Sequence, residues 1–194
     1  MADGDSANTS VISLSSHAGT HIDVPRHFCR EGSPVIDLFQ RLNTYAPAYC
    51  IDLAAMGDTC IRPEDLEGVI DGKGDAEALL IRTGSWQLRT TDPHTYMAKH
   101  PWVPAGVAAL LRRKCPRLRV LGIDTISIST PSHRQEGQES HRAFLCDKHP
   151  IYLLEDVDLS LVTPKDASEL TLLPWLLDDL DGVPVTAFLK SNRC

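Results

Sequence analysis

Short apolar runs rich in β-branched residues recur along the chain, and segments containing Gly, Pro or Asp separate them. Runs of this kind, bounded by turn-forming residues, are typical of buried β-strands. A clear example follows the turn predicted at 71–75, where the next residues are almost all apolar. Strands are predicted at 49–54, 78–81, 118–129, 151–154 and 184–189, and residues 11–16 are expected to be extended.

Other segments have the spacing of amphipathic helices. Pro63 begins one of them, since proline is tolerated at the first helical position and the acidic residues after it complement the helix dipole. Pro104 begins a second, in which Val107, Leu110 and Leu111 follow the helical period. Because strands and helices alternate, the sequence predicts a mixed α/β fold. The remaining predictions are a polar loop at 130–140 and a short helix at 141–146.

Length and charge limit the class of protein. The 194 residues suffice for one core, so residues 1–194 are interpreted as one domain. A net charge of -7 with scattered basic residues would repel a phosphate backbone, which argues against a nucleic-acid partner. No apolar stretch approaches the roughly 20 residues that cross a bilayer, and the start does not resemble a signal peptide. We therefore expect a cytoplasmic protein without a membrane partner.

The cysteines support the same location. A chain of this size needs no disulfides for stability, and no C-x-x-C motif is present. Cys50 and Cys146 lie in apolar surroundings, where a reduced thiol behaves as a small apolar side chain. All six cysteines are therefore expected to be free thiols in a reducing cytoplasm: Cys29, Cys50, Cys60, Cys115, Cys146 and Cys194.

The segment at 17–27 reads HAGTHIDVPRH and concentrates metal-binding residue types. In an extended chain, alternate side chains share a face, so His17, His21 and Asp23 would lie together, and Gly19 would leave space between the two imidazoles. The glycine, the β-branched residues and the proline of this segment disfavour a helix. Two imidazoles and a carboxylate suit zinc, and also manganese or iron, with a position left for water.

His27 extends this cluster. Pro25 ends regular strand pairing, so His27 is expected to point back toward that water. An imidazole accepts and returns a proton near neutral pH, which suits a general acid/base. The alternative is a set of ordinary loop histidines, which is the better interpretation for any one of them alone. Three of the eight histidines fall within eleven residues, beside an acid, and this density favours a metal site.

The pattern H-x-G-T-H-x-D-x-P-x-H resembles the signature of the cyclase family of metal-dependent hydrolases, whose members include kynurenine formamidase (arylformamidase) and isatin hydrolase. All seven fixed positions of the pattern are present. The resemblance implies the α/β fold of that family, a swivelling β/β/α domain with a mixed sheet or open barrel and flanking helices. Further segments resemble the family along nearly the whole chain: LLIRTG at 79–84, LGIDT at 121–125, His141-Arg142 and Glu155-Asp156-Val157.

The resemblance also implies a ligand set for one or two divalent ions, zinc or manganese. His17, His21 and Asp23 correspond to the ligands of one ion. Asp23 can bridge to a second ion, which the counterparts of His141 and Glu155 complete. Without the resemblance, His141 would be interpreted as an exposed or helix-capping histidine, and Glu155 as a solvated acid at a strand end.

Other roles follow with less support from the residues themselves. His27 corresponds to the general acid/base of the family. The spacing before Glu155 is slightly longer than usual in the family, so Asp156 is the alternative ligand. Ser85 and Trp86 are candidates to bind substrate, since aromatic walls suit an aryl amide, and a buried core tryptophan is the alternative. Asp124 is a candidate to orient a ligand, and four histidines are expected to be bystanders: His94, His100, His133 and His149.

Together with these residues, the resemblance implies a hydrolase that cleaves an amide C–N bond by means of a metal-activated water. The substrate that the resemblance implies is a formamide such as N-formylkynurenine, or a cyclic amide such as isatin. The alternatives are a metal-binding homologue without catalysis, which the presence of His27 disfavours, and a hydrolase of another carbonyl compound such as a lactone. The sequence contains neither G-x-S-x-G nor H-E-x-x-H, which argues against a serine hydrolase and that class of zinc protease.

Two further expectations concern assembly and the N-terminus. Members of the family are dimers or tetramers, so a homodimer or homotetramer is expected here. Sixteen residues precede His17, which is a short N-terminus relative to the family. The segment that it lacks normally helps to form the pocket and the subunit contacts, so a more open site, a different specificity or a partner that fills the gap is expected.

Overall fold

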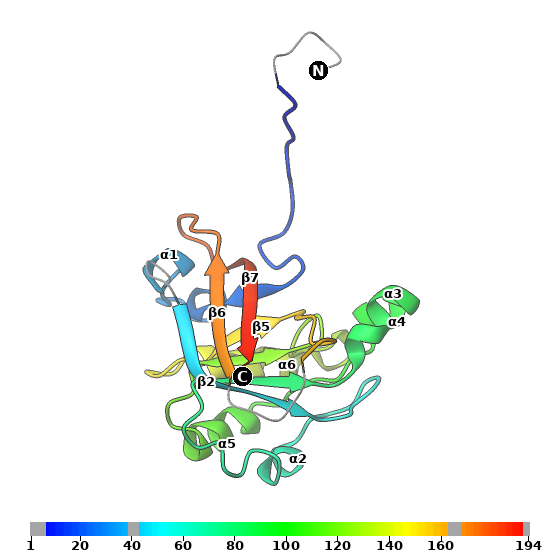
Figure 1. The fold of residues 1–194 in the computed structure, drawn as a ribbon, viewed down its shortest axis with the longest axis vertical. Helices are drawn as coiled ribbons and strands as arrows, with labels where there is room; N and C mark the ends of the chain where they lie inside the picture. Colours follow the sequence, from blue (N-terminus) through cyan, green and yellow to red (C-terminus); the bar gives the residue numbers. More distant parts are fainter. Residues whose placement is uncertain (1–6, 39–42, 163–167, 192–194) are drawn as a thin grey trace.

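The computed structural model describes residues 7–38, 43–162 and 168–191. Its strands form a closed barrel in the order β1-β5-β4-β3-β2-β6-β7 (Figure 1). The four strands from β2 to β5 pair in parallel, and the other pairs are antiparallel. The predicted mixed α/β class is confirmed, and the barrel is closed rather than open. The strands are β1 (His21–Asp23), β2 (Asn43–Asp52), β3 (Ala78–Arg82), β4 (Val120–Ile123), β5 (Tyr152–Glu155), β6 (Ser168–Pro174) and β7 (Gly182–Ser191).

Helices connect the strands and cover part of the barrel. In Figure 1, α2 and α5 lie beneath the barrel, and α3 and α4 lie together at one side. Within the described residues, no helix is both long and apolar enough to cross a membrane. The α-helices are α1 (Val35–Leu38), α2 (Pro63–Glu67), α3 (Leu88–Thr91), α4 (Pro93–Ala98), α5 (Gly106–Lys114) and α6 (Arg134–Leu145), and the 3-10 helices are η1 (Pro25–His27), η2 (Ser85–Gln87) and η3 (Pro131–His133).

Strand β3 shows how the sequence builds two cores. Leu79 and Ile81 pack into a core shared with α2, α5 and α6, whereas Ala78 and Leu80 belong to a second core to which every strand of the barrel contributes. This alternation follows the period of two along a strand and gives β3 its continuous apolar sequence. A Cβ at Gly122 of β4 would lie 2.3 Å from Leu80 Cδ2, so the glycine makes room for the leucine of the neighbouring strand.

Helix α6 corrects one prediction. The segment 130–140 was expected to be a loop, but η3 begins at Pro131 and α6 at Arg134. The buried face of α6 includes Gly137 and Ser140 in addition to apolar residues, so its first turns lack a hydrophobic signal. A Cβ at Gly137 would lie 2.3 Å from Ser129 Cβ, which shows how closely the helix approaches the preceding loop. Strand β4 is also shorter than the run predicted at 118–129.

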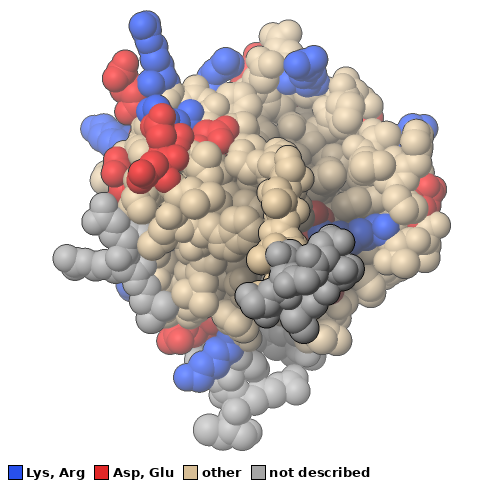
Figure 2. Space-filling model, turned by 90° about the horizontal axis from the view of Figure 1, so that it is seen from above, with Lys and Arg blue, Asp and Glu red and all other residues tan. Residues whose placement is uncertain are grey.

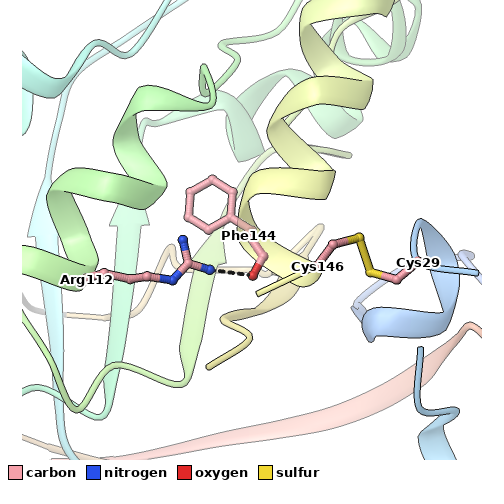
Figure 3. Close-up of a disulfide and its surroundings, with 4 residues drawn as sticks. All are labelled: Cys29, Arg112, Phe144 and Cys146. Carbon is pink, nitrogen blue, oxygen red and sulfur yellow. Dashed lines mark hydrogen bonds between the residues drawn. A yellow bond between two sulfur atoms is a disulfide. The ribbon is translucent and has the colours of Figure 1, made fainter. Parts of the chain in front are cut away.

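A disulfide corrects a second prediction. Cys29 and Cys146 were expected to be free thiols, but they are bonded to each other and join the end of η1 to the end of α6 (Figure 3). The two residues are 117 positions apart, so no local motif signals their pairing. Cys50, Cys60 and Cys115 are free, as predicted, and Cys194 lies outside the described residues. Because two of the six cysteines are bonded, the cysteines no longer indicate a reducing compartment, and the cytoplasmic location stays a prediction.

The N-terminal segment extends away from the barrel in Figure 1. Residues 8–15 adopt neither helix nor strand, and Val11 and Ile12 are 98% and 72% exposed. Figure 2 views this end of the molecule, where residues without formal charge form most of the surface around the segment. Trp175 and Leu177 are about half exposed and line a cavity together with Ile12 and neighbouring residues. This end of the molecule therefore exposes several apolar side chains on a mostly uncharged surface.

Candidate metal centre

Strands β1 and β5 place three buried polar side chains together. His21 is the register partner of Glu155, and Asp23 lies two residues further along the same face of β1. His21 Nε2 lies 3.3 Å from Glu155 Oε2 and 3.4 Å from Asp23 Oδ1. His21 Nδ1 lies 2.8 Å from the carbonyl oxygen of Gly19, and this contact orients the ring so that Nε2 faces the two carboxylates. All three side chains are at most 3% exposed.

His141 completes this group from α6. Its Nε2 lies 3.6 Å from Glu155 Oε1 and 3.7 Å from Asp23 Oδ2. Its Nδ1 lies 2.7 Å from the carbonyl oxygen of Gly137, one helical turn earlier, and this contact fixes the orientation of the ring. Glu155 also accepts hydrogen bonds from Ile128 N at 2.7 Å and Ser127 Oγ at 3.1 Å. The carboxylate is therefore held rigidly between strand, loop and helix.

His17 joins the group through a turn rather than through strand alternation. Only residues His21–Asp23 of this segment are in a strand, and Gly19 has φ of 65°, where a side chain would be strained. His17 Nδ1 nevertheless lies 2.8 Å from Asp23 Oδ1. A Cβ at Gly182 would lie 2.5 Å from His17 Cε1, so the glycine leaves room for the ring. His17 therefore lies beside Asp23 as predicted, but the extended backbone predicted between them was wrong.

His27 lies at the edge of the cluster, in η1. Its Nε2 is 3.9 Å from Asp23 Oδ2, and its ring centroid is 4.2 Å from that of His17 and 5.9 Å from that of His141. Its Nδ1 is 2.8 Å from Oδ2 of Asp181. Proline at the start of η1 follows the end of the strand, and His27 lies with Nε2 toward Asp23. Its orientation toward a metal-bound water stays a prediction.

Asp181 is a site residue that the sequence did not reveal. It lies immediately before β7, and its carboxylate contacts His27 and also His17 Nε2, at 3.1 Å. Burial alone would raise the pKa of Asp181, but the hydrogen bonds from His17 and His27 lower it to about 2. Asp181 is therefore an anionic acceptor for both imidazoles. No motif surrounds it, since a single acid before a strand is common at a protein surface.

The electrostatics show a centre that requires positive charge. Burial alone would lower the pKa of His21, but hydrogen bonding and charge from Glu155, with the charge of Asp23, raise it to about 9. Burial alone would raise the pKa of Glu155, but the hydrogen bonds from His141 and His21 lower it. Glu155 is thus a buried carboxylate whose negative charge is balanced by imidazolium groups or by a bound cation.

The donor set fits a divalent cation. Three groups of side chains, among the described residues, bring one ligand atom each to within 4.8 Å of one another. Nitrogen and carboxylate donors with this composition suit zinc and manganese. Glu155 lies next to these groups through its contacts with His21 and His141. The groups are His17, His21 and Asp23; Asp23, His27 and His141; and His17, His27 and Asp181.

Other candidates lie in separate networks. Ser85 is fully buried and bonds to Thr83 Oγ1, which in turn donates to Asp124. Asp124 accepts hydrogen bonds from the turn after β3 and so fixes that turn rather than a metal ligand. Asp156 bonds to Tyr96 and pairs with Arg89, so the geometry favours Glu155 over Asp156 as the ligand.

A cavity of about 500 Å³ lies beside the cluster, and its lining includes His141 and Phe28. Phe28 stacks on His141 with ring centroids 4.6 Å apart. His100, expected to be a bystander in a polar loop, is 1% exposed and also lines this cavity. Neither Ser85 nor Trp86 is among the lining residues, so their proposed contact with substrate has no support from this geometry.

A closed mixed barrel with a buried cluster of imidazoles and carboxylates defines a candidate metal-dependent enzyme centre. Residues 4–130 match the model of the family described as putative cyclase, and the chain belongs to this family. The kynurenine formamidase of Geobacillus thermodenitrificans is 37% identical over 193 residues, which cover 97% of this chain and 83% of the relative. The kynurenine formamidase of Bacillus thuringiensis (strain Al Hakam) is 36% identical, covering 95% and 81%.

Solved structures share the fold. An isatin hydrolase bound to the product analogue thioisatinate superposes with a TM-score of 0.74 and 20% identity, covering 93% of this chain and 74% of its own. A predicted metal-dependent hydrolase from Bacillus stearothermophilus gives a TM-score of 0.71 and 22% identity, with coverage of 95% and 82%. The family resemblance inferred from the segment at 17–27 is therefore confirmed.

Proposed function

We propose that this protein hydrolyses the C–N bond of a non-peptide amide, with a formamide of an aryl amine as the leading substrate. The observation that carries the proposal is the convergence of His21, Asp23, His141 and Glu155 in one buried cluster with His27 at its edge. Curated relatives at 36–37% identity are named kynurenine formamidase, which supports the same chemistry.

We further propose that the cluster holds one or two divalent ions, zinc or manganese. His17, His21 and Asp23 would hold one, and Asp23 with His141 and Glu155 would hold a second. Such an ion, when bound, lowers the pKa of water to near 7 and polarises a carbonyl group. Backbone carbonyl groups fix the orientation of His21 and His141 through Nδ1. This supports a ligand role, because a metal-binding imidazole usually donates a hydrogen bond from the ring nitrogen that does not bind the metal.

His27 would transfer the protons of the reaction. The anionic Asp181 requires a donor, so it favours the proton on Nδ1 of His27 and leaves Nε2 free to accept one. In the balanced reaction, the hydroxyl of water bonds to the acyl carbon, the C–N bond breaks, and the proton passes through Nε2 to the leaving nitrogen. The products are an amine and a carboxylic acid, which is formate when the acyl group is formyl.

The proposal is tested with purified protein stripped by a chelator and reloaded with zinc or manganese. We expect metal in elemental analysis, and hydrolysis of N-formyl aryl amines above that of isatins and lactones. Replacing His27 with alanine should abolish turnover while metal content stays unchanged. A protein that neither binds metal nor hydrolyses any of these compounds contradicts the proposal, and a His27→Ala variant with normal turnover contradicts the role of His27.

We also propose that the protein forms a homo-oligomer through its apolar N-terminal end, and that it acts in the cytoplasm on a small-molecule substrate. The exposed apolar residues Ile12 and Trp175 support the first of these proposals.

A further inference from the structure

The cavity beside the cluster is connected to it through three residues. His141 lines the cavity and contacts Glu155. Ser127 also lines it, and its hydroxyl donates to the same carboxylate. Phe28 forms another part of the lining and stacks on His141. A molecule in this cavity therefore lies directly against the Glu155 side of the proposed centre.

One face of α6 forms a wall of this cavity. Arg134, Gly137, Gln138 and His141 all line it, with the spacing i, i+3, i+4 and i+7 that places side chains on one helix face. Arg134 is the first residue of the helix, and His141 lies two turns later. Seven residues of helix separate these positions by about 10 Å along the axis. The two ends of one small molecule can therefore reach both side chains.

Arg134 is the distinctive residue of this wall. Among the described residues that line the cavity, it carries the only fixed charge. It is exposed, and it makes no hydrogen bond or ion pair with any other residue of the described ranges, in contrast to Arg82, which pairs with Asp52. A guanidinium group is well suited to bind a carboxylate through two parallel hydrogen bonds.

Two more observations favour an anionic ligand group at this end. Thr130 lines the cavity too, and its buried hydroxyl has no hydrogen-bond partner in the described part of the chain. A carboxylate oxygen at this wall would offer an acceptor to it. The carboxylates of Asp23 and Glu155 lie at the other end, so an acidic substrate would be repelled unless a cation such as Arg134 fixed its charge there.

We propose that Arg134 is a specificity-determining residue that selects amides carrying a carboxylate on the order of 10 Å from the scissile C–N bond. The apolar walls contributed by Phe28, Met97 and Ile126 suit an aryl or alkyl spacer between the two groups. This proposal rests on the proposed amide hydrolysis, and it adds the chemical class of the substrate.

The test compares 4-(4-formamidophenyl)butanoate with its primary amide, which is nearly identical in shape but uncharged. The wild-type protein should favour the carboxylate. Arg134→Gln should raise KM for the carboxylate about 10- to 100-fold, with kcat and the neutral substrate little affected, because a hydrogen bond to a charged group is worth this factor. Arg134→Lys should restore part of the preference. Arg113→Gln, which removes a cation from the exposed face of α5, is the matched control and should change nothing.

Binding of the product amine is measured in parallel, so that failure of the proposed reaction can be distinguished from failure of the proposed role of Arg134. Calorimetry with the product amine, 4-(4-aminophenyl)butanoate, reports on the pocket without turnover. If neither formamide is hydrolysed but Arg134→Gln weakens binding of this amine, amide hydrolysis fails and the anion site stands. If Arg134→Gln binds it as the wild type does, or affects both formamides equally, the role of Arg134 is overturned whether or not hydrolysis occurs.

Discussion

Nδ1 of His27 lies 2.8 Å from Oδ2 of Asp181, although 154 positions separate the two residues in the chain. The same carboxylate oxygen also contacts His17 Nε2, so Asp181 orients the proposed proton-transfer group from within the cluster, through the ring nitrogen that does not face Asp23. Asp181 therefore acts as a positioning residue for His27, in the way that a carboxylate commonly orients a catalytic imidazole.

The first prediction concerns Asp181→Asn. The amide keeps the shape of the carboxylate but does not favour the same imidazole tautomer, so kcat should fall about 10- to 100-fold with little change in KM. Steady-state kinetics and elemental analysis of the same preparation measure this. Asp179→Asn is the control, because Asp179 lies two residues earlier, is 71% exposed and pairs with Arg26 rather than with a histidine of the cluster. A loss of metal in proportion to activity would show that Asp181 acts through His17 instead.

The second prediction concerns the close approach of α6. In Gly137→Ala, the added Cβ would lie 2.3 Å from Ser129 Cβ, so the helix must shift and carry His141 with it. The free energy of unfolding should fall by about 1–3 kcal/mol, and bound metal should decrease. Chemical denaturation and elemental analysis measure the two effects. Gly68→Ala is the control, since the Cβ of an alanine there would have no atom within 4 Å and the backbone is right-handed helical. Equal stability of both variants contradicts the prediction.

Site residues that are close together in the sequence were predictable from it, whereas those far along the chain were not. His21 and Asp23 lie in one short segment, where strand periodicity alone places them on the same face. Glu155 required the family resemblance, because a single acid after an apolar strand has no distinguishing pattern. Asp181 contributes from the loop before β7, and only the closure of the barrel brings it to His27.

The fold shows the same division. Strand β3 was predicted nearly to its ends, because both of its faces are buried and its sequence is continuously apolar. The first turns of α6 were missed, because Gly137 and Ser140 fill buried positions without hydrophobic side chains. The disulfide between Cys29 and Cys146 was missed because its partners are 117 positions apart and only the tertiary fold brings them together.

The third prediction concerns that disulfide. Cys29 is two residues after His27, and Cys146 is five residues after His141, so the bond restrains both elements of the site. Replacing both cysteines with serine should lower the free energy of unfolding by about 2–5 kcal/mol, because the bond closes a long loop in the unfolded chain. Urea unfolding with and without a dithiol reductant measures this, and the wild type, but not the double variant, should respond to the reductant. Cys60→Ser, which removes a free thiol, should retain that response. Free alkylation of Cys29 and Cys146 in the native, unreduced protein contradicts the pairing.

The fourth prediction concerns metal removal and pH. The pKa of His21 in the metal-free protein is raised to about 9, whereas an unfolded histidine has a pKa near 6.5. This contribution to stability is complete below pH 6.5 and is lost as the pH rises through about 9. A divalent cation competes with the proton on His21, so stabilisation by zinc or manganese should increase over the same range.

Thermal unfolding at pH 6, 7.5 and 9, with and without metal, measures both trends. At a free metal concentration 100 times the dissociation constant, the free energy of unfolding should rise by about 2.7 kcal/mol. His21→Ala should lose this gain, and His94→Ala, which replaces an exposed histidine of α4, should keep it. Metal stabilisation that is equal at pH 6 and pH 9 contradicts the assignment of His21 as a ligand.

The fifth prediction concerns assembly. Ile12 and Trp175 are 72% and 48% exposed and line a common apolar cavity at the N-terminal end, and contiguous apolar surface of this kind favours an interface. We expect light scattering to show a dimer or tetramer, and Ile12→Ser with Trp175→Ser to shift it toward the monomer. Leu161→Ser is the control, because Leu161 is 95% exposed and is absent from the lining of that cavity. A monomeric wild type, or an oligomer that the double variant leaves intact, contradicts an interface at this end.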